Sequence, residues 1–386
     1  MLDDVDLLVC GAGPVGCVIA ERAASVLGWK VLIVDRRPHL AGNCHDSYRH
    51  GVLTHDYGPH YFRTNDAELL GYLGRFTEWV PARYEVRSLV NGQMLPFPIN
   101  LNTLERFFGV PLDESAAAEL LARLRVDIPA PRNSEELVLS QVGKELFDAL
   151  YRDYTLKQWG MPAAELEPGV CGRIPVRLTR DDRYVDHRFQ VMPRRGFAAL
   201  FEQMVCHRKI RVLLECDFAE VRGLIRPRVA TVYSGPIDAY FGYRLGRLPY
   251  RSLAFEFRHH QREFVQPCVQ INYPDDRPHT RSVEIKHATG QRCPNTVVSY
   301  ETPQAAGEPF YPIPTTANQA LYRRYQELAA AETATNRVYF CGRLAQYRYF
   351  NTDEVIQEAL RCFQQIHRRF VAVPVSSSWS LATINS

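Results

Sequence analysis

The order of hydrophobic and polar positions changes along the chain. Near the N-terminus an apolar run at residues 5–10 is followed by helical spacing over residues 17–27 and a second apolar run at residues 30–34. This alternation of strand, helix and strand predicts an α/β unit over residues 1–80. The same pattern returns over residues 325–368. We therefore expect both stretches to belong to one α/β domain.

The later stretch places a glycine between a strand and a helix. Residues 338–341 are apolar and lead into Gly342 and Arg343. Helical spacing begins after Asn351 and Thr352, and either residue is a suitable N-cap. This pattern predicts a second helix N-terminus close to the first α/β unit.

The hydrophobic residues in the middle of the chain are spaced differently. Residues 100–150 have the apolar spacing of helices, whereas residues 244–301 alternate as antiparallel strands do. The predicted fold class is α/β, with a Rossmann-like domain interrupted by a small helical domain and an antiparallel β-sheet domain. The expected boundaries are 1–80 with 193–243 and 325–368 for the Rossmann-like domain, 98–153 for the helical domain, 81–97 with 154–192 and 244–324 for the sheet domain, and 369–386 for a tail.

Composition narrows the classes of function. The 386 residues are 46% hydrophobic with a formal net charge of +3, so we expect no nucleic-acid partner and no membrane insertion. No apolar run reaches the length of about 18 residues that a membrane helix needs, and no signal peptide is present, so we expect a cytoplasmic protein.

The ten cysteines lack C-x-x-C spacing, which predicts reduced thiols and no metal site. Only five of the 46 basic residues are lysine, so one arginine alone is a weak sign of a site.

The glycines after the first strand form a dinucleotide-binding fingerprint. Gly11 permits a tight turn, Gly13 lets the main chain approach a pyrophosphate, and Gly16 lets the next helix pack closely on the sheet. The second strand ends at Asp35, which can accept hydrogen bonds from ribose hydroxyls. We therefore predict a bound dinucleotide.

The loop after the second strand favours FAD over NAD. Arg36 follows Asp35, and the small-residue loop HLAGN ends in Gly42 and Asn43. An acid, a basic residue and such a loop are typical of two-dinucleotide flavoproteins. We expect the Rossmann-like domain to bind FAD.

Several further motifs together resemble the bacterial UDP-galactopyranose mutases. The chain contains HDYGPHYFRTND (55–66), YTLKQWG with GRIPVR (154–177), GRLAQYRYFN (342–351), YSGPIDAYFGYRLGRLPYRSL (233–253), HTRSVEIKH (279–287) and EPFYPIP (308–314). The resemblance covers essentially residues 3–365.

The resemblance implies an isomerase that uses FAD, active when reduced and primed by NAD(P)H or another reductant. Its members interconvert UDP-galactopyranose and UDP-galactofuranose in a redox-neutral ring contraction, in which flavin N5 attacks the anomeric carbon and forms a flavin-sugar iminium adduct. Family members are commonly homodimers, and galactofuranose serves cell wall biosynthesis. We expect the same of this chain.

The resemblance also implies roles for individual residues. Tyr154 would stack on the uracil ring, with Thr155 beside it and Trp159 lining the pocket. Arg173 and Arg281 would bind the diphosphate and act in catalysis, because a guanidinium pairs bidentately with phosphate oxygens.

The remaining implied contacts lie at the phosphates, the uridine and the flavin. The other substrate contacts are hydroxyl and amide side chains: Tyr184, Tyr311, Tyr349, Asn272 and Asn351. His60 would lie beside the flavin ring and act in catalysis. The expected cofactor contacts are Gly11, Gly13, Pro14, Val15, Gly16, Asp35, Arg36, Gly42, Asn43, His60, Tyr61, Phe218, Gly342, Arg343, Tyr349, Asn351 and Thr352.

The chain departs from the family pattern at four of these motif positions. Ala41 and His45 replace a glycine and a tyrosine, Arg63 replaces a histidine, and Asn351 replaces an aspartate. The last two changes remove a titratable group near the flavin or the phosphates, so they bear on how the flavin is tuned.

Two other functions stay open at this point. A flavin oxidoreductase shares the dinucleotide fold, but it would consume NAD(P)H or oxygen in proportion to its product. A flavin- or nucleotide-binding protein would bind UDP and convert nothing. Taken alone, an aromatic ring is also explained as a core residue, and an arginine as a solvated surface residue.

Overall fold

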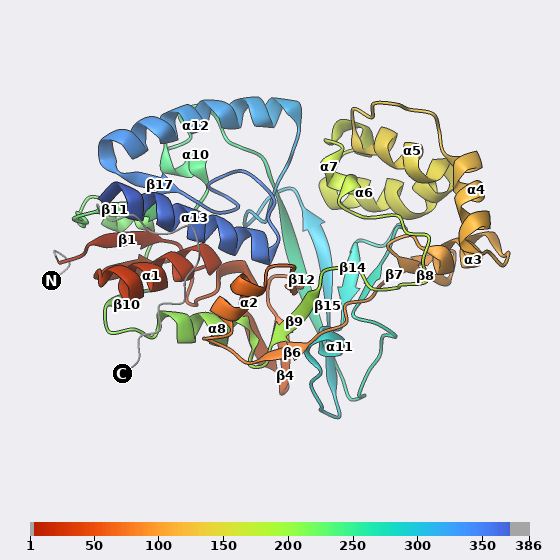
Figure 1. The fold of residues 1–386 in the computed structure, drawn as a ribbon, viewed down its shortest axis with the longest axis horizontal. Helices are drawn as coiled ribbons and strands as arrows, with labels where there is room; N and C mark the ends of the chain where they lie inside the picture. Colours follow the sequence, from red (N-terminus) through yellow and green to blue (C-terminus); the bar gives the residue numbers. More distant parts are fainter. Residues whose placement is uncertain (1–3, 371–386) are drawn as a thin grey trace.

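The computed structural model describes residues 4–370, and its first part is a five-stranded parallel sheet (Figure 1). The strand order is β10-β2-β1-β11-β17, and all pairs are parallel. The strands are β1 (Leu7–Cys10), β2 (Val31–Val34), β10 (Ile210–Leu213), β11 (Ala230–Tyr233) and β17 (Val338–Phe340). The Rossmann-like α/β prediction is confirmed.

Helices cover this sheet. α1 (Pro14–Leu27) packs against both α13 (Thr352–Phe370) and α8 (Gly196–Val205). On the opposite face, Leu8 of β1 packs with Leu32 and with α9 (Phe218–Val221). Further helices follow the strands: α10 (Ile237–Tyr240) after β11, and α12 (Thr316–Asn336) packed against β17.

The second part is a seven-stranded sheet in the order β16-β12-β15-β14-β13-β7-β8. Its strands are β7 (Val86–Val90), β8 (Gln93–Phe97), β12 (Tyr250–His260), β13 (Gln270–Asn272), β14 (Arg281–Val283), β15 (Thr296–Gln304) and β16 (Tyr311–Pro312). All neighbours are antiparallel except β13 and β7, which run parallel. The predicted antiparallel sheet thus contains one parallel pair, in which β7 comes from a distant, earlier segment of the chain and not from a hairpin.

One stretch expected to continue as a strand is helical. After β14 the chain turns into α11 (Lys286–Thr289). The Lys286 ammonium donates to the carbonyls of Glu263, Cys293 and Asn295, and these bonds hold the turn against two neighbouring loops. A long-range contact of this kind overrides the local alternating pattern.

The third part is a helical group at one end of the large sheet (Figure 1). It contains α3 (Leu101–Phe108), α4 (Glu114–Leu124), α5 (Ser134–Phe147), the π-helical turn η2 (Asp148–Arg152), α6 (Asp153–Trp159), the 3-10 turn η3 (Ala163–Glu165) and α7 (Gly169–Gly172). The predicted boundary at residue 153 falls within the continuous helical segment from α5 to α6. The predicted tail lies outside the described residues from residue 371 on.

Small elements join the three parts. These are the hairpin β3 (Asp46–Arg49) and β4 (Val52–His55), the three-stranded sheet of β5 (Phe62–Thr64), β9 (Phe189–Pro193) and β6 (Trp79–Pro81), the helix α2 (Ala67–Leu73) and the 3-10 turn η1 (Gly42–Cys44). Within residues 4–370 no helix combines the length and the apolar character required to cross a membrane. The same residues contain no group of three or more His, Cys, Asp or Glu side chains that could hold a metal ion.

The packing of α1 on β1 depends on Gly16, and this leads to a test. A Cβ on Gly16 would lie 1.8 Å from the Gly11 carbonyl oxygen, whereas a Cβ on Gly71 in α2 would meet nothing within 4 Å. We expect Gly71→Ala to stabilise the protein by up to about 1 kcal/mol through helix propensity. Gly16→Ala should destabilise it by about 1–3 kcal/mol through overpacking. Urea unfolding measures both, and equal stability of the two variants would contradict this view of α1.

Candidate active site: two joined cavities

A first cavity of about 950 Å³ lies at the carboxyl ends of the parallel strands, where open α/β sheets bind ligands. Its wall contains most of the residues predicted to contact the flavin. These are Gly11, Gly13, Pro14, Val15, Asp35, Arg36, Gly42, Asn43, His60, Phe218, Gly342, Arg343 and Thr352.

The glycine turn after β1 forms a main-chain cradle in this cavity. Gly11 has a φ of 105°, and a Cβ there would lie 2.1 Å from the Ser234 hydroxyl oxygen. Gly13 is the N-cap of α1 and supplies no side-chain cap, so N–H groups of the first turn are available to an anion. A Cβ on Gly42 would lie 3.0 Å from Gly13 Cα, and Gly42 has a φ of 54°, so the close approach of these two main-chain segments favours glycine at position 42. The cradle fits a pyrophosphate.

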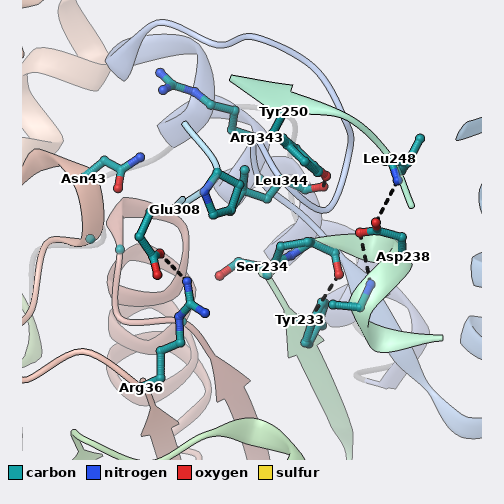
Figure 2. A pocket seen from close by; sticks show the side chains of 18 of the residues that line it. Arg36, Asn43, Tyr233, Ser234, Asp238, Leu248, Tyr250, Glu308, Arg343 and Leu344 are labelled. Carbon is teal, nitrogen blue, oxygen red and sulfur yellow. Dashed lines mark hydrogen bonds and ion pairs between the residues drawn. The ribbon is translucent and has the colours of Figure 1, made fainter. Parts of the chain in front are cut away.

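Asp35, at the end of β2, fixes the main chain around the cavity. Its two carboxylate oxygens accept the main-chain N–H groups of Ala12 at 2.7 Å and Arg37 at 2.8 Å, which fixes the glycine turn relative to the end of β2. Figure 2 shows Arg36 and Glu308 pointing toward one another across this cavity, where they form an ion pair. Arg36 therefore engages a residue of the large sheet's β15–β16 loop. A carboxylate, a glycine cradle and a long cavity together suit a dinucleotide.

A second cavity of about 530 Å³ adjoins the first and shares part of its wall. Residues from both the Rossmann-like sheet and the helical group meet at the junction. The residues that line both cavities are Asn43, His60, Trp159, Arg343, Phe350 and Thr352. Arg343 is held there by its hydrogen bond to the Phe350 carbonyl at 2.8 Å.

His60 at this junction is a neutral imidazole. Burial, together with nearby His55, Arg343 and Arg281, lowers its pKa to about 3. The ring Nδ1 lies 3.0 Å from the Gly58 carbonyl, so Nδ1 carries the proton and Nε2 is left as an acceptor. The main-chain N–H of His60 also donates to His55 Nδ1 at 2.9 Å, which fixes the loop.

All predicted substrate residues line the second cavity. They are Tyr154, Thr155, Trp159, Arg173, Tyr184, Asn272, Arg281, Tyr311, Tyr349 and Asn351. They come from α6, the loop after α7, the strands β13, β14 and β16, and the segment before α13. Burial raises the pKa of Tyr154 to about 12, so its hydroxyl stays protonated.

Guanidinium groups gather in this cavity. Arg281 donates to Glu301 from Nε at 2.7 Å and to the Tyr311 hydroxyl at 3.3 Å. Arg173 lies over the Tyr349 ring, with its Cζ 4.8 Å from the ring centroid, and Arg343 approaches the same ring at 4.9 Å. Burial of Tyr349 disfavours its ionisation, but the surrounding arginines outweigh burial and lower the pKa of this phenol. The cavity therefore has a positive potential suited to an anion.

Two of the departures from the family pattern contact each other. Arg63 on β5 donates through Nη2 to the Asn351 side-chain oxygen at 2.8 Å. Asn351 precedes α13, its main-chain N–H donates to Glu354 at 2.7 Å, and its carbonyl accepts from Val355. The residue before α13 is thus the N-cap, and Arg63 adds a further cation to the second cavity.

Some predicted cofactor residues lie elsewhere. Tyr61, Tyr349 and Asn351 line the second cavity and not the first. Gly16 lines neither cavity and serves the packing of α1.

Sequence reasoning missed a further set of lining residues. They are Arg37, Tyr84, Gln158, Tyr250, Arg251 and Glu308. Arg37 lies two residues after the acid of the fingerprint, and Glu308 opens the EPFYPIP motif. Gln158, Tyr250 and Arg251 lie within the YTLKQWG and 233–253 motifs, so these also had a local signal. Tyr84 lies outside the motifs and is placed by tertiary contacts such as its hydrogen bond to Gln270.

The potential in the second cavity can be measured through Tyr349. Arg173 makes the largest of the arginine contributions to the pKa of Tyr349, so Arg173→Gln should raise that pKa. The ultraviolet absorbance of tyrosinate, followed against pH and corrected with Tyr349→Phe proteins, measures the change. Excess pyrophosphate should raise the pKa of Tyr349 in the wild type as well. Superimposable titrations of the wild type and Arg173→Gln would contradict the assignment.

Comparison with known proteins agrees with this geometry. The family model for UDP-galactopyranose mutase matches residues 149–349, and that for an NAD(P)-binding Rossmann-like domain matches residues 9–76. The chain is 37% identical to a probable UDP-galactopyranose mutase of Klebsiella pneumoniae, covering 93% of this chain and 94% of that protein. It is 33% identical to a dTDP-fucopyranose mutase of Escherichia coli, covering 93% and 97% of the two chains.

Solved structures show the same fold. A crystal structure of reduced UDP-galactopyranose mutase superposes with a TM-score of 0.74 at 16% identity, covering 95% of this chain and 96% of that chain. A putrescine oxidase structure superposes with a TM-score of 0.57 at 12% identity, covering 95% and 99% of the two chains. The fold alone is shared by a mutase and an oxidase, whereas the family model and the 37% identical relative are both of the mutase. The chain therefore belongs to the UDP-galactopyranose mutase family.

Proposed function

We propose that this chain is a UDP-galactopyranose mutase that interconverts UDP-galactopyranose and UDP-galactofuranose with reduced FAD. The observation that carries the proposal is the shared wall of the two cavities. A glycine-lined cavity suited to a dinucleotide meets, at His60, Trp159 and Arg343, a positively charged cavity lined by tyrosines. A sugar attached to a diphosphate in the second cavity can therefore reach a cofactor in the first.

The first cavity supplies the groups that FAD needs. Asp35 would accept from the adenosine ribose, and the cradle of Gly11, Gly13 and Gly42 would hold the pyrophosphate. The N-terminus of α13 at Thr352 would lie near the flavin ring and favour negative charge there. Bound and reduced by NAD(P)H or another reductant, FAD supplies a nucleophile for the anomeric carbon, so the overall reaction has no net redox change.

The second cavity supplies contacts for the nucleotide. Tyr154 on α6 would stack on the uracil, with Thr155 and Trp159 on the same helix shaping the pocket. Asn272 on β13 would contact the uridine. An aromatic ring suits the base end, whereas the arginines suit the diphosphate.

Arg173 and Arg281 would stabilise the diphosphate as its bond to the sugar breaks. Negative charge grows on the departing phosphate oxygens, and preorganised guanidinium and phenol donors stabilise that charge in a site shielded from water. Glu301 already holds Arg281 in place at 2.7 Å, so little reorganisation is needed. His60 holds its proton at Nδ1 and would offer Nε2 as an acceptor beside the sugar and the flavin.

A second candidate substrate is a dTDP-linked 6-deoxyhexose. The relative from Escherichia coli is named a dTDP-fucopyranose mutase and is 33% identical to this chain, close to the 37% of the Klebsiella pneumoniae relative. Both reactions would use the same two cavities, so only the base and the hexose distinguish them.

The remaining parts of the proposal concern the setting. We propose a homodimer in the cytoplasm that makes galactofuranose precursor for cell wall biosynthesis, in keeping with the family resemblance. Sedimentation of the purified protein tests the dimer.

The test of function is to give dithionite-reduced protein UDP-galactofuranose or dTDP-fucofuranose and to follow the pyranose products by chromatography. Oxidised protein is the control. Conversion of UDP-galactofuranose only after reduction supports the proposal, and faster conversion of the dTDP sugar would reassign the substrate. Turnover that consumes NAD(P)H or oxygen in proportion to product would instead indicate an oxidoreductase. Binding of UDP without any conversion would indicate a binding protein.

Both arginines of the diphosphate site should be needed for turnover. We expect Arg173→Ala and Arg281→Ala each to lower kcat by about 100-fold or more, because each removes a charge-assisted contact to the leaving group. FAD content, read from the flavin absorbance, should be unchanged. Arg323→Ala, on the exposed side of α12 and outside both cavity walls, is the matched control. Normal turnover of either site variant would remove that residue from the mechanism.

A further inference from the structure

Helix α6 has a second face that does not touch the cavities. Tyr154, Thr155 and Trp159 on this helix line the second cavity, whereas Lys157 lines neither cavity. Lys157 therefore cannot contact a diphosphate in the second cavity, although it lies within the same motif. Its role has to be found in what it touches.

The Lys157 ammonium is surrounded by main-chain carbonyls of one turn. Nζ donates to the carbonyl oxygens of Tyr273 at 2.8 Å, Asp275 at 2.7 Å and Arg277 at 2.7 Å. These are all three donors that an ammonium has. The three acceptors belong to the turn between β13 and β14, residues 273–280, whose tip at residues 276–278 is exposed.

This turn joins two strands of the substrate cavity. Asn272 at the end of β13 and Arg281 at the start of β14 face each other in the strand register and both line the second cavity. A second bond ties the same turn to α6, because the Thr280 hydroxyl donates to the Gln158 side-chain oxygen at 3.0 Å. Helix α6 and the strands that this turn joins thus both contribute to the wall of one cavity, and the helix and the turn are bonded to each other.

The use of lysine at this position is informative in an arginine-rich chain. Of the five lysines, Lys157 and Lys286 each place Nζ among three main-chain carbonyls. A compact ammonium with three rotatable donors can satisfy three converging carbonyls, whereas the planar fork of a guanidinium matches oxygens that lie in one plane. Lysine is therefore kept where this chain otherwise uses arginine.

We propose that Lys157 is a positioning residue that fixes the β13–β14 turn to α6, and so sets Asn272 and Arg281 at the distance from Tyr154 at which one nucleotide sugar spans them. This inference rests on the proposed function, because it assumes that both walls hold the same ligand. Without the three Lys157 hydrogen bonds, the side-chain bond between Thr280 and Gln158 would remain to hold the turn to α6. Asn272 and Arg281 stay in their strands, but α6 with Tyr154 would then take several positions relative to them, and binding would have to select one.

The decisive comparison is between Lys157→Met and Lys286→Met in the FAD-loaded protein. Both substitutions remove a lysine bonded to three carbonyls, but Lys286 lines neither cavity. We expect Lys157→Met to weaken UDP binding to the oxidised enzyme by about ten-fold or more and to raise KM more than it lowers kcat. Lys286→Met should leave UDP affinity unchanged. Calorimetry with UDP and steady-state kinetics of the reduced enzyme provide these readouts.

Hydrogen exchange tests the clamp itself. In Lys157→Met, the hydrogen-bonded amides of Tyr273, Arg277 and Thr280 should exchange about ten-fold faster than in the wild type, while those of α1 should be unaffected. If the wild type fails to bind UDP, the proposed function fails, but this exchange result still decides whether Lys157 holds the turn. If Lys157→Met does not fold, Lys157→Arg keeps the charge without the three-way geometry and should show the same two changes to a smaller extent. Unchanged UDP affinity and unchanged exchange in a folded Lys157 variant would overturn the proposal, as would an equal loss of affinity in Lys286→Met.

Discussion

The arrangement of the site depends on holding several guanidinium groups in one cavity with little negative charge to neutralise them. Arg63, Arg173 and Arg343 make no ion pair with a carboxylate within residues 4–370, and only Arg281 has one, to the fully buried Glu301. Desolvating a charge is costly unless polar groups replace the water. Here the replacements are uncharged: the Phe350 carbonyl for Arg343, the Asn351 amide for Arg63, and the Tyr349 ring for Arg173. These partners orient the cations and leave their charge available to a ligand.

The three parts of the fold are needed together to build that cavity. The parallel sheet contributes the glycine cradle and the N-terminus of α13, the large sheet contributes Arg281 and Tyr311, and the helical group contributes α6. Side-chain contacts hold these three parts of the fold to one another. Arg36 pairs with Glu308 across the first cavity, and Arg251 on β12 donates to the carbonyls of Lys157 and Gln158 at the end of α6. Arg251 thereby supplies both a C-terminal cap to α6 and a tie between the helix and the large sheet.

The parts of this structure that follow from local sequence were predictable, and the parts that follow from distant contacts were not. The fingerprint from Gly11 to Asp35 predicted the first cavity because turn, helix dipole and terminal acid are all set within one βαβ unit. The residues of the second cavity came from the family resemblance alone, since no local pattern distinguishes Tyr154 from a core tyrosine. Arg251 lies within the motif of residues 233–253, but the motif does not reveal its role, because its partners lie on α6, about 90 residues earlier in the chain. The parallel pairing of β13 with β7 escaped prediction for the same reason: register between strands from separate segments is decided by packing.

The paired departures at Arg63 and Asn351 show how substitutions in such a cavity constrain each other. An arginine beside a carboxylate at position 351 would form an ion pair, and the two charges would cancel in the potential that a ligand meets. The amide of Asn351 accepts the same hydrogen bond at 2.8 Å without carrying charge, so Arg63 is held in position and remains a cation. Asn351 also keeps its main-chain role as the N-cap of α13, which an aspartate would serve equally well. The capping requirement therefore does not explain the asparagine, whereas the electrostatic requirement does. Arg63 with Asn351 therefore makes the cavity more positive than an arginine paired with an aspartate would, with the same hydrogen-bonding frame.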